Sequence, residues 1–170
     1  MNFTIKQGGH YTNKRWWIWF NRHNRRRVLT YSVVLSKDWW YSDKLVSFSG
    51  WNKIFGFGAW NHHNHSARFV CKPDDLQEGR LVVAAYTYES GVWTAKEFSD
   101  YYVENAKTMS IESVYGANPA ETGYLFKCGA NEEFVRHPNP RYEKKLWPYF
   151  GGHDRAYKEL RATLKKIVKP

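Results

Sequence analysis

Three histidines gather in one short stretch of the sequence, at His62, His63 and His65. Imidazole nitrogens are common ligands of zinc, copper and nickel, so this cluster first suggests a metal site. On an extended strand, His63 and His65 would share one face and His62 would point away. Two histidines on one face need further ligands, and no second regularly spaced motif supplies them. We therefore favour a polar loop that leads into a strand, and we expect no metal and no cofactor.

Catalytic motifs do not stand out either. A hydrolase needs two carboxylates, or a nucleophile with a base, brought together. The acidic pairs Asp74-Asp75 and Glu132-Glu133 fall in turn-like stretches, and Ser66 lacks the GxSxG pattern of a nucleophile elbow. The sequence also contains no Walker loop, Rossmann fingerprint or HExxH motif. We expect that the protein is not an enzyme.

Aromatic residues make up 18% of the chain and supply candidate binding residues. Trp39, Trp40 and Trp60 fall in predicted loops, where a flat ring can face solvent and stack on a sugar. His62, His63 and Arg68 lie near Trp60 and could contact hydroxyl groups at the rim of a binding site. The alternatives are that the tryptophans cap the ends of the fold and that Arg68 only pairs at a buried edge.

A cationic run supplies a second candidate surface. Arg22, Arg25, Arg26 and Arg27 cluster in a polar turn, in a chain with 26 Lys and Arg against 16 Asp and Glu. Such a tip can contact phosphates while nearby aromatics stack bases. It can equally dock on carboxylates of an acidic protein, or remain a solvated positive face. No nucleic-acid motif accompanies it, so the partner stays open.

Short strands must position these residues. Alternating or continuous apolar runs separated by turns predict about ten strands, and hence an antiparallel β-sandwich or barrel in a single domain, residues 1–170. The expected strands are residues 3–5, 15–20, 28–35, 53–57, 67–71, 80–88, 92–93, 108–115, 124–128 and 133–136. Residues 15–20 and 28–35 would form a hairpin that carries the arginines at its tip. Residues 157–168 fit both an amphipathic helix and a strand.

Four segments together resemble a family of small, largely uncharacterised proteins of gut-type bacteria and their phages. They are residues 9–11 (GHY), 52–57 (NKIFGF), 62–69 (HHNHSARF) and 147–152 (WPYFGG). The last segment is also similar to the final segments of jelly-roll sandwiches related to lectins and glucanases. The resemblance implies a jelly-roll-like β-sandwich, a final strand in place of the helix, and no established activity. Residues 38–50 and 97–140 depart from the family pattern.

These observations lead to one hypothesis and two alternatives. We expect a non-enzymatic β-sandwich that acts by binding, as a phage virion-associated protein of the capsid, decoration or tail-connecting kind. Its partners would be other virion proteins or an acidic protein surface. The alternatives are a carbohydrate-binding module and a nucleic-acid-binding protein that uses the basic hairpin tip.

The cellular setting follows from what the sequence lacks. No signal peptide is visible, and no run approaches the roughly 18 apolar residues of a membrane span. We expect a virion or host-cytoplasm location without membrane contact. In that setting Cys71 and Cys128, which have no CxxC partners, would be buried and reduced.

Overall fold

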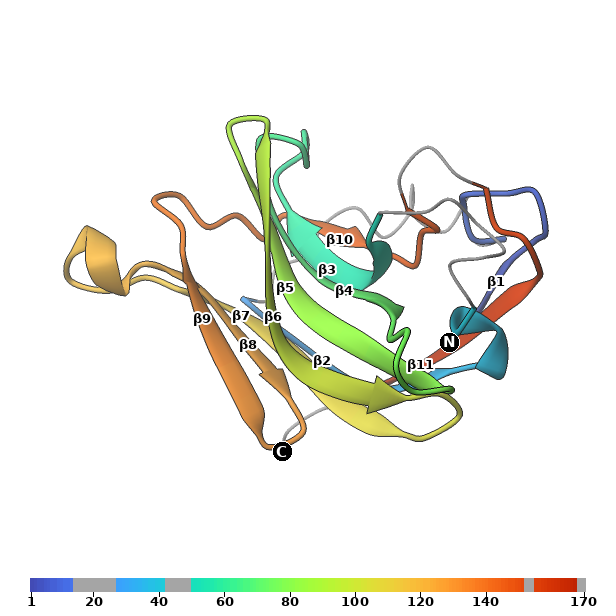
Figure 1. Ribbon diagram of the computed structural model, residues 1–170. Coiled ribbons are helices and arrows are strands. Elements are labelled where there is room, and N and C mark those ends of the chain that lie inside the picture. The colour runs from blue at the N-terminus through green and yellow to red at the C-terminus, as the bar shows by residue number, and fades with distance from the viewer. Residues whose placement is uncertain (14–26, 42–49, 152–154, 168–170) are drawn as a thin grey trace.

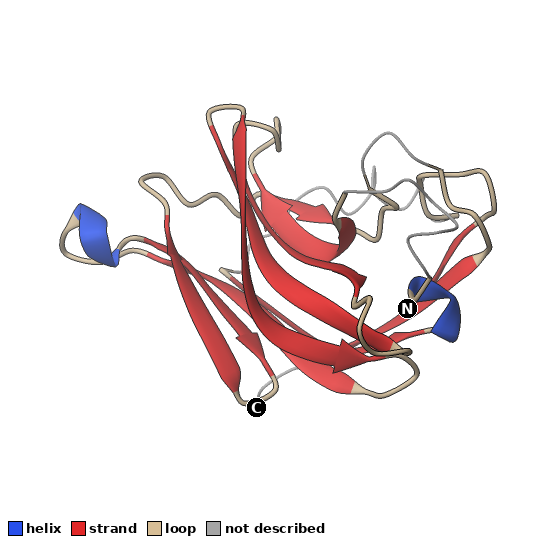
Figure 2. Ribbon diagram, viewed as in Figure 1, coloured by secondary structure: helices blue, strands red, loops and turns tan. Residues whose placement is uncertain are grey.

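The protein is a β-sandwich of two antiparallel sheets in the computed structural model (Figures 1 and 2). The structure describes residues 1–13, 27–41, 50–151 and 155–167. A six-stranded sheet has the order β1-β11-β2-β7-β8-β9, and a five-stranded sheet has the order β10-β3-β4-β5-β6. The predicted all-β sandwich is confirmed.

The strands are β1 (Asn2–Ile5), β2 (Val28–Leu35), β3 (Asn52–Gly58), β4 (His65–Pro73), β5 (Arg80–Glu89), β6 (Val92–Tyr102), β7 (Lys107–Val114), β8 (Gly123–Cys128), β9 (Asn131–Arg136), β10 (Lys144–Leu146) and β11 (Leu160–Lys166). Among the described residues, the single-turn 3-10 helices η1 (Lys37–Trp39) and η3 (Pro119–Glu121) lie in the connections. The predicted strand at residues 15–20, and with it the predicted hairpin to residues 28–35, lies outside the described residues.

Hairpins build most of the five-stranded sheet. Strands β3, β4, β5 and β6 follow one another along the chain and pair in that order. The tight turn between β5 and β6 has Ser90 at φ 49° and Gly91 at φ 87°, the left-handed values that hairpin turns require. A similar turn with Gly129 at φ 62° joins β8 and β9. These turns join strands that were predicted from the sequence at residues 80–88 and 92–93 and at residues 124–128 and 133–136.

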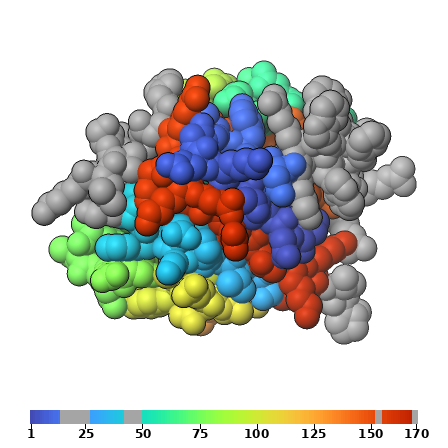
Figure 3. Space-filling view, turned by 90° about the vertical axis from the view of Figure 1, so that its right-hand side faces the viewer, coloured from blue at the N-terminus to red at the C-terminus, as the bar shows by residue number. Residues whose placement is uncertain are grey.

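The two ends of the described chain meet in the six-stranded sheet. Phe3 of β1 lies opposite Ala162 of β11, and β11 in turn pairs with β2. Figure 3 shows the N-terminal residues in blue against the C-terminal residues in red. Leu160, Ala162 and Leu164 alternate with exposed residues, which is the period of a strand. The helical alternative for this tail is therefore wrong.

Aromatic side chains fill the space between the sheets. Phe55, Phe57, Phe69 and Phe126 have no exposed surface, and their rings contact each other or neighbouring tyrosines. Ile54 of β3 is buried in the same core. Cys71 and Cys128 are buried and unbonded, which confirms the expectation for both thiols.

Trp39 belongs to the core, so the expectation of a solvent-facing ring is wrong here, and the alternative of a tryptophan that caps the end of the fold is the one that the structure shows. It lies in η1, where the sequence analysis expected a loop, and it has no exposed surface. Its indole Nε1 donates a hydrogen bond to the carbonyl oxygen of Arg161 at 2.9 Å. The residue closes one end of the sandwich, because a large ring that also finds an acceptor is stable when buried there.

Candidate anion-binding site

The candidate site lies on the outer face of the five-stranded sheet, the face turned away from the six-stranded sheet. Strand β4 places Ala67, Phe69 and Cys71 in the core. Arg68 alternates with them, so it points to the outer face. It lies opposite Gly56 of β3 and Tyr86 of β5 in the strand register. Cross-strand partners share one face, so these three residues form a row across the sheet.

Gly56 allows the arginine to lie close to the sheet. A Cβ atom at this position would lie 2.7 Å from the Arg68 Cα and 2.9 Å from its Cγ. Both distances are shorter than real Cβ contacts. Only glycine therefore leaves room for the stem of Arg68 beside β3.

Arg68 is a buried cation, and none of the described residues is an acidic partner for it. Only 8% of the residue is exposed, and its Nε has no hydrogen-bond acceptor within the described part of the chain. Among the described residues, none of the ion pairs involves Arg68. Burial lowers the pKa of its guanidinium to about 10, while the nearby hydroxyls of Tyr86, Tyr88 and Tyr149 favour the charged form. A charge buried in this way is costly unless something compensates it.

Further basic groups surround this guanidinium. Burial, and then the charge of Arg68, lower the pKa of Lys53 to about 8. The Lys53 ammonium lies 5.4 Å from the ring centre of Tyr86 and 5.7 Å from that of Tyr149. Burial also lowers the pKa of His62 to about 3, with the charges of Arg68, His63 and Lys144 adding to the effect. The site is thus positively charged at neutral pH with His62 uncharged.

His62 and His63 come to this site from the connection between β3 and β4. The two imidazole rings lie 4.2 Å apart, and the ring of His63 meets Tyr88 edge-on at 5.1 Å. The carbonyl oxygens of His63 and Asn64 accept hydrogen bonds from Gly91 and Ser90 in the β5–β6 turn. The loop and the hairpin tip therefore hold each other in place, and they lie side by side in Figure 1.

Residues far apart in the sequence complete the site. Tyr149 pairs its backbone with Lys53, the second residue of β3, through two hydrogen bonds of 2.9 and 3.0 Å. The ring of Tyr149 stacks on His10 at 5.6 Å and meets Tyr11 at 5.1 Å. Three of the sequence segments that carry the family resemblance, residues 9–11, 52–57 and the described residues 147–151, thus meet beside the fourth, which carries Arg68.

The predicted rim residues have different outcomes. The structure brings His62, His63 and Arg68 together, and Arg68 lowers the pKa of both histidines after burial does. Trp60 lies in the same connection and is 49% exposed. Trp40 packs partly against the core, and its Nε1 donates to the carbonyl oxygen of Asp74 at 3.2 Å. The edge-pairing alternative for Arg68 is wrong, because β4 is the central strand and Arg68 forms no ion pair among the described residues.

The predicted basic tip is described only in part. Arg22, Arg25 and Arg26 lie outside the described residues. Arg27 is exposed and precedes β2, where its guanidinium lies 4.8 Å from the ring centre of Tyr115 and 5.9 Å from that of Tyr142. The described contacts of its side chain are therefore aromatic and do not involve the Arg68 site.

The histidine cluster does not gather as a metal centre in the described part of the chain. Over these residues, no group of three or more His, Cys, Asp or Glu side chains could hold a metal ion. His65 opens β4, and its ring lies 5.3 Å from His137. His137 Nε2 donates to the carbonyl oxygen of Tyr88, and its Nδ1 accepts from the backbone of Asn139, so this imidazole is neutral.

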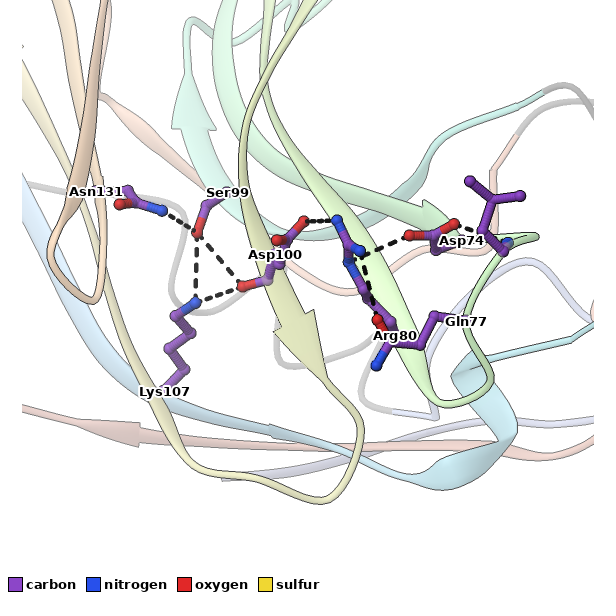
Figure 4. A network of polar contacts seen from close by, with 8 residues as sticks. Asp74, Gln77, Arg80, Ser99, Asp100, Lys107 and Asn131 are labelled. Atoms are coloured by element: carbon purple, nitrogen blue, oxygen red, sulfur yellow. Dashed lines mark hydrogen bonds and ion pairs between the residues drawn. The ribbon is translucent and has the colours of Figure 1, made fainter.

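A second arginine, Arg80 at the start of β5, has the opposite environment (Figure 4). Its Nη2 lies 3.0 Å from an oxygen of Asp100, and its Nε lies 3.2 Å from an oxygen of Asp74. The hydrogen bond with Asp100 raises the pKa of Arg80, whereas burial lowers that of Arg68. Arg80 already has carboxylate partners, so it is a matched comparison for the unpaired Arg68.

The polar network around Arg80 joins the two sheets. Lys107 of β7 donates to the backbone oxygen of Asp100 and to Ser99 Oγ, and Asn131 of β9 donates to the same hydroxyl. An open depression of about 270 Å³ lies beside this network, lined by Arg80, Val82, Glu97, Phe98, Ser99, Asp100 and Asn131. Because its charged groups are mutually paired, this network is best explained as structural.

Sequence reasoning missed Lys53, Tyr86, Tyr88 and Tyr149. The alternation in YTY placed Tyr86 and Tyr88 on one face, which was a visible signal. The sequence does not show whether this face is the inner or the outer face of the sheet. It also does not show that Lys53 and Tyr149 lie on the same face, because both depend on pairings between distant segments.

Comparisons with protein-family models, with curated proteins and with solved structures found no match. No helix among the described residues is long and apolar enough to cross a membrane. What the site does must therefore be argued from its own geometry.

Proposed function

We propose that this protein is a binding protein that takes an anionic group of its ligand at Arg68, on the outer face of the five-stranded sheet. The observation that carries this proposal is a guanidinium that is almost fully buried and has no carboxylate partner among the described residues. A carboxylate or phosphate would supply the missing charge and accept hydrogen bonds from the planar guanidinium.

The neighbours of Arg68 support binding of an anion. Lys53 adds a second positive charge, and the tyrosines around it provide hydroxyl groups and ring faces. Tyr86 and Tyr88 lie on the same strand. Each has an apolar ring and a polar hydroxyl group, which suits a surface that is partly exposed to water. These residues bind and orient a ligand, and no catalytic step is assigned to them.

A phage virion is the setting that the resemblance of four sequence segments suggests for such a protein. The net charge of +10 fits docking on an acidic surface of another virion protein. Mass spectrometry of purified virions tests this setting, since a virion component must be found there. Its absence from virions would remove the setting and leave the binding proposal in place.

The binding proposal is tested with the variant Arg68→Gln and its matched control Arg80→Gln. Isothermal titration measures binding of an oligogalacturonate, an acidic peptide, a single-stranded oligonucleotide and inorganic phosphate at low salt. We expect at least one of them to bind and Arg68→Gln to weaken that binding by about tenfold or more, with Arg80→Gln within about twofold. Circular dichroism confirms that both variants are folded. Equal affinities of wild type and Arg68→Gln for every anion would contradict the proposal.

A further inference from the structure

A flat aromatic surface lies beside the charged site. Trp93 of β6 stacks on Tyr86 with ring centres 5.6 Å apart and an interplanar angle of 13°. Tyr86 is only 4% exposed, whereas Trp93 is 53% exposed. The indole is thus held on one side by a fixed ring and remains open to solvent. An aromatic side chain fixed in this way can stack on a ligand without losing further freedom on binding.

The spacing between this surface and Arg68 suits a short saccharide. Arg68 lies opposite Tyr86, and Trp93 lies opposite Tyr88 one strand further on. Two strand spacings separate β4 from β6, which is about 10 Å across the sheet. An acidic saccharide of two or more rings can span this distance, with the C–H face of one ring on the indole and a carboxylate at the guanidinium.

The charge pattern of this face favours a single anionic group over a phosphate chain. Along the outer face, Glu97 lies opposite Ala84 and pairs with Lys72 at 2.7 Å. Asp100 lies opposite Val82 and pairs with Arg80. Lys72 and Arg80 on the same face are therefore already paired with carboxylates and do not extend the positive site for a polyanion laid along it. A nucleic acid requires a row of exposed cations, and Arg68 is recessed.

We infer that the ligand is an acidic carbohydrate, with its carboxylate at Arg68 and a sugar ring stacked on Trp93. This inference rests on the proposed function and adds the chemical class of the ligand. Hydroxyl and imidazole groups of Tyr88, Tyr149, His62 and His63 border the same site and are suited to hydrogen bonds with sugar hydroxyls. A surface of a few polar groups around an aromatic platform is typical of small-ligand recognition.

Two matched pairs of probes test the inference. One pair is an oligogalacturonate and its methyl ester, which has the same rings without the charges. The other pair is sialyllactose and lactose. We expect the acid of at least one pair to bind about tenfold or more tightly than its neutral partner, and Arg68→Gln to remove that difference. Trp93→Ala should weaken binding of the acid by about fivefold or more, while Tyr102→Ala, an exposed aromatic at the other end of β6, should leave it unchanged.

The outcomes separate this inference from the proposed function. If neither acidic sugar binds, but an oligonucleotide, an acidic peptide or phosphate does so through Arg68, the carbohydrate inference is overturned and the proposed function stands. If the acids bind through Arg68 with full affinity in Trp93→Ala, the stacking part of the inference is overturned. If no anion depends on Arg68, both proposals fall.

Discussion

Arg68 of β4 lies directly opposite Tyr86 of β5, a ring that is itself covered by Trp93. The buried charge and the exposed indole are thus linked through one tyrosine, and the two sides of the site are positioned by the same strand. Strand pairing fixes this arrangement more firmly than a loop would, because backbone hydrogen bonds join β4 to β5 and β5 to β6.

Replacing Arg68 by methionine should stabilise the fold while it abolishes anion binding. An unpaired buried charge is unfavourable, and an apolar side chain of similar length removes that cost. We expect the free energy of unfolding of Arg68→Met to rise by about 1 kcal/mol or more, measured by urea denaturation. A loss of about 2 kcal/mol would show that the guanidinium is stabilised in the free protein, contrary to the site described above.

Gly56→Ala should destabilise the protein through a backbone clash. The added Cβ would lie 2.0 Å from the carbonyl oxygen of Ala67, so β3 and β4 would have to move apart. We expect a loss of about 2 kcal/mol or more in the free energy of unfolding. The control is Gly91→Ala, where nothing lies within 4 Å and only the φ of 87° is unfavourable, at about 1 kcal/mol. Equal losses in both variants would contradict the close packing at Gly56.

Acidification should destabilise the wild type more than His62→Gln. The pKa of His62 is about 3 in the folded state and 6.5 without perturbation, so the unfolded chain takes up this proton first. Stability from the neutral imidazole is therefore present above pH 6.5 and decreases as the pH falls toward 3. Between about pH 7 and pH 4, we expect the free energy of unfolding of the wild type to decrease by about 1 kcal/mol or more beyond the decrease in His62→Gln. If urea denaturation gave the same pH dependence of stability for both proteins, His62 would not cause the loss of stability at acidic pH.

Anion affinity should decrease as the pH rises above about 8. The lowered pKa of Lys53 means that its ammonium begins to lose its proton there, while a bound anion favours the protonated form. We expect the dissociation constant to increase by up to about tenfold per pH unit above pH 8. Lys53→Gln should bind more weakly at neutral pH and show a flatter profile, whereas Lys158→Gln should behave as wild type. If the dissociation constant of Lys53→Gln depended on pH as it does in the wild type, a group other than Lys53 would cause the pH dependence.

Replacing Trp39 and replacing Trp60 should have different effects on the stability of the protein, although the sequence alone suggested the same role for both. Trp39→Ala removes a fully buried ring and its hydrogen bond, so we expect a loss of about 3–5 kcal/mol. Trp60→Ala changes a side chain that is about half exposed, so a loss below about 1 kcal/mol is expected. Thermal unfolding followed by circular dichroism measures both. A comparable loss in Trp60→Ala would place Trp60 in the structural core with Trp39.

The fold was predictable because strand signals are local. Alternation in residues 28–35 and the turn at Gly91 each follow from a few neighbouring residues. Trp39 was misassigned for the opposite reason. Whether a tryptophan outside a predicted strand faces solvent or covers the end of a sandwich depends on elements distant in the sequence, here the backbone of Arg161.

The candidate site was predictable only where its residues lie in one stretch. His62, His63 and Arg68 were found together because they are close in the sequence and polar beside an apolar run. Tyr149 and Trp93 enter through pairings with β3 and β5, and register between distant strands is a property of the folded sheet. The unpaired state of Arg68 likewise becomes visible only when its three-dimensional neighbours are known.

The pairing of β1 with β11 sets a condition on how the chain acquires its structure. Phe3 of β1 pairs with Ala162 of β11, which is synthesised much later. The six-stranded sheet therefore cannot be completed during synthesis until residues 160–166 have left the ribosome. The hairpins from β3 to β6 depend on near neighbours and can form earlier. The five-stranded sheet that carries Arg68 is therefore expected to assemble first, with closure of the sandwich as the slow final step.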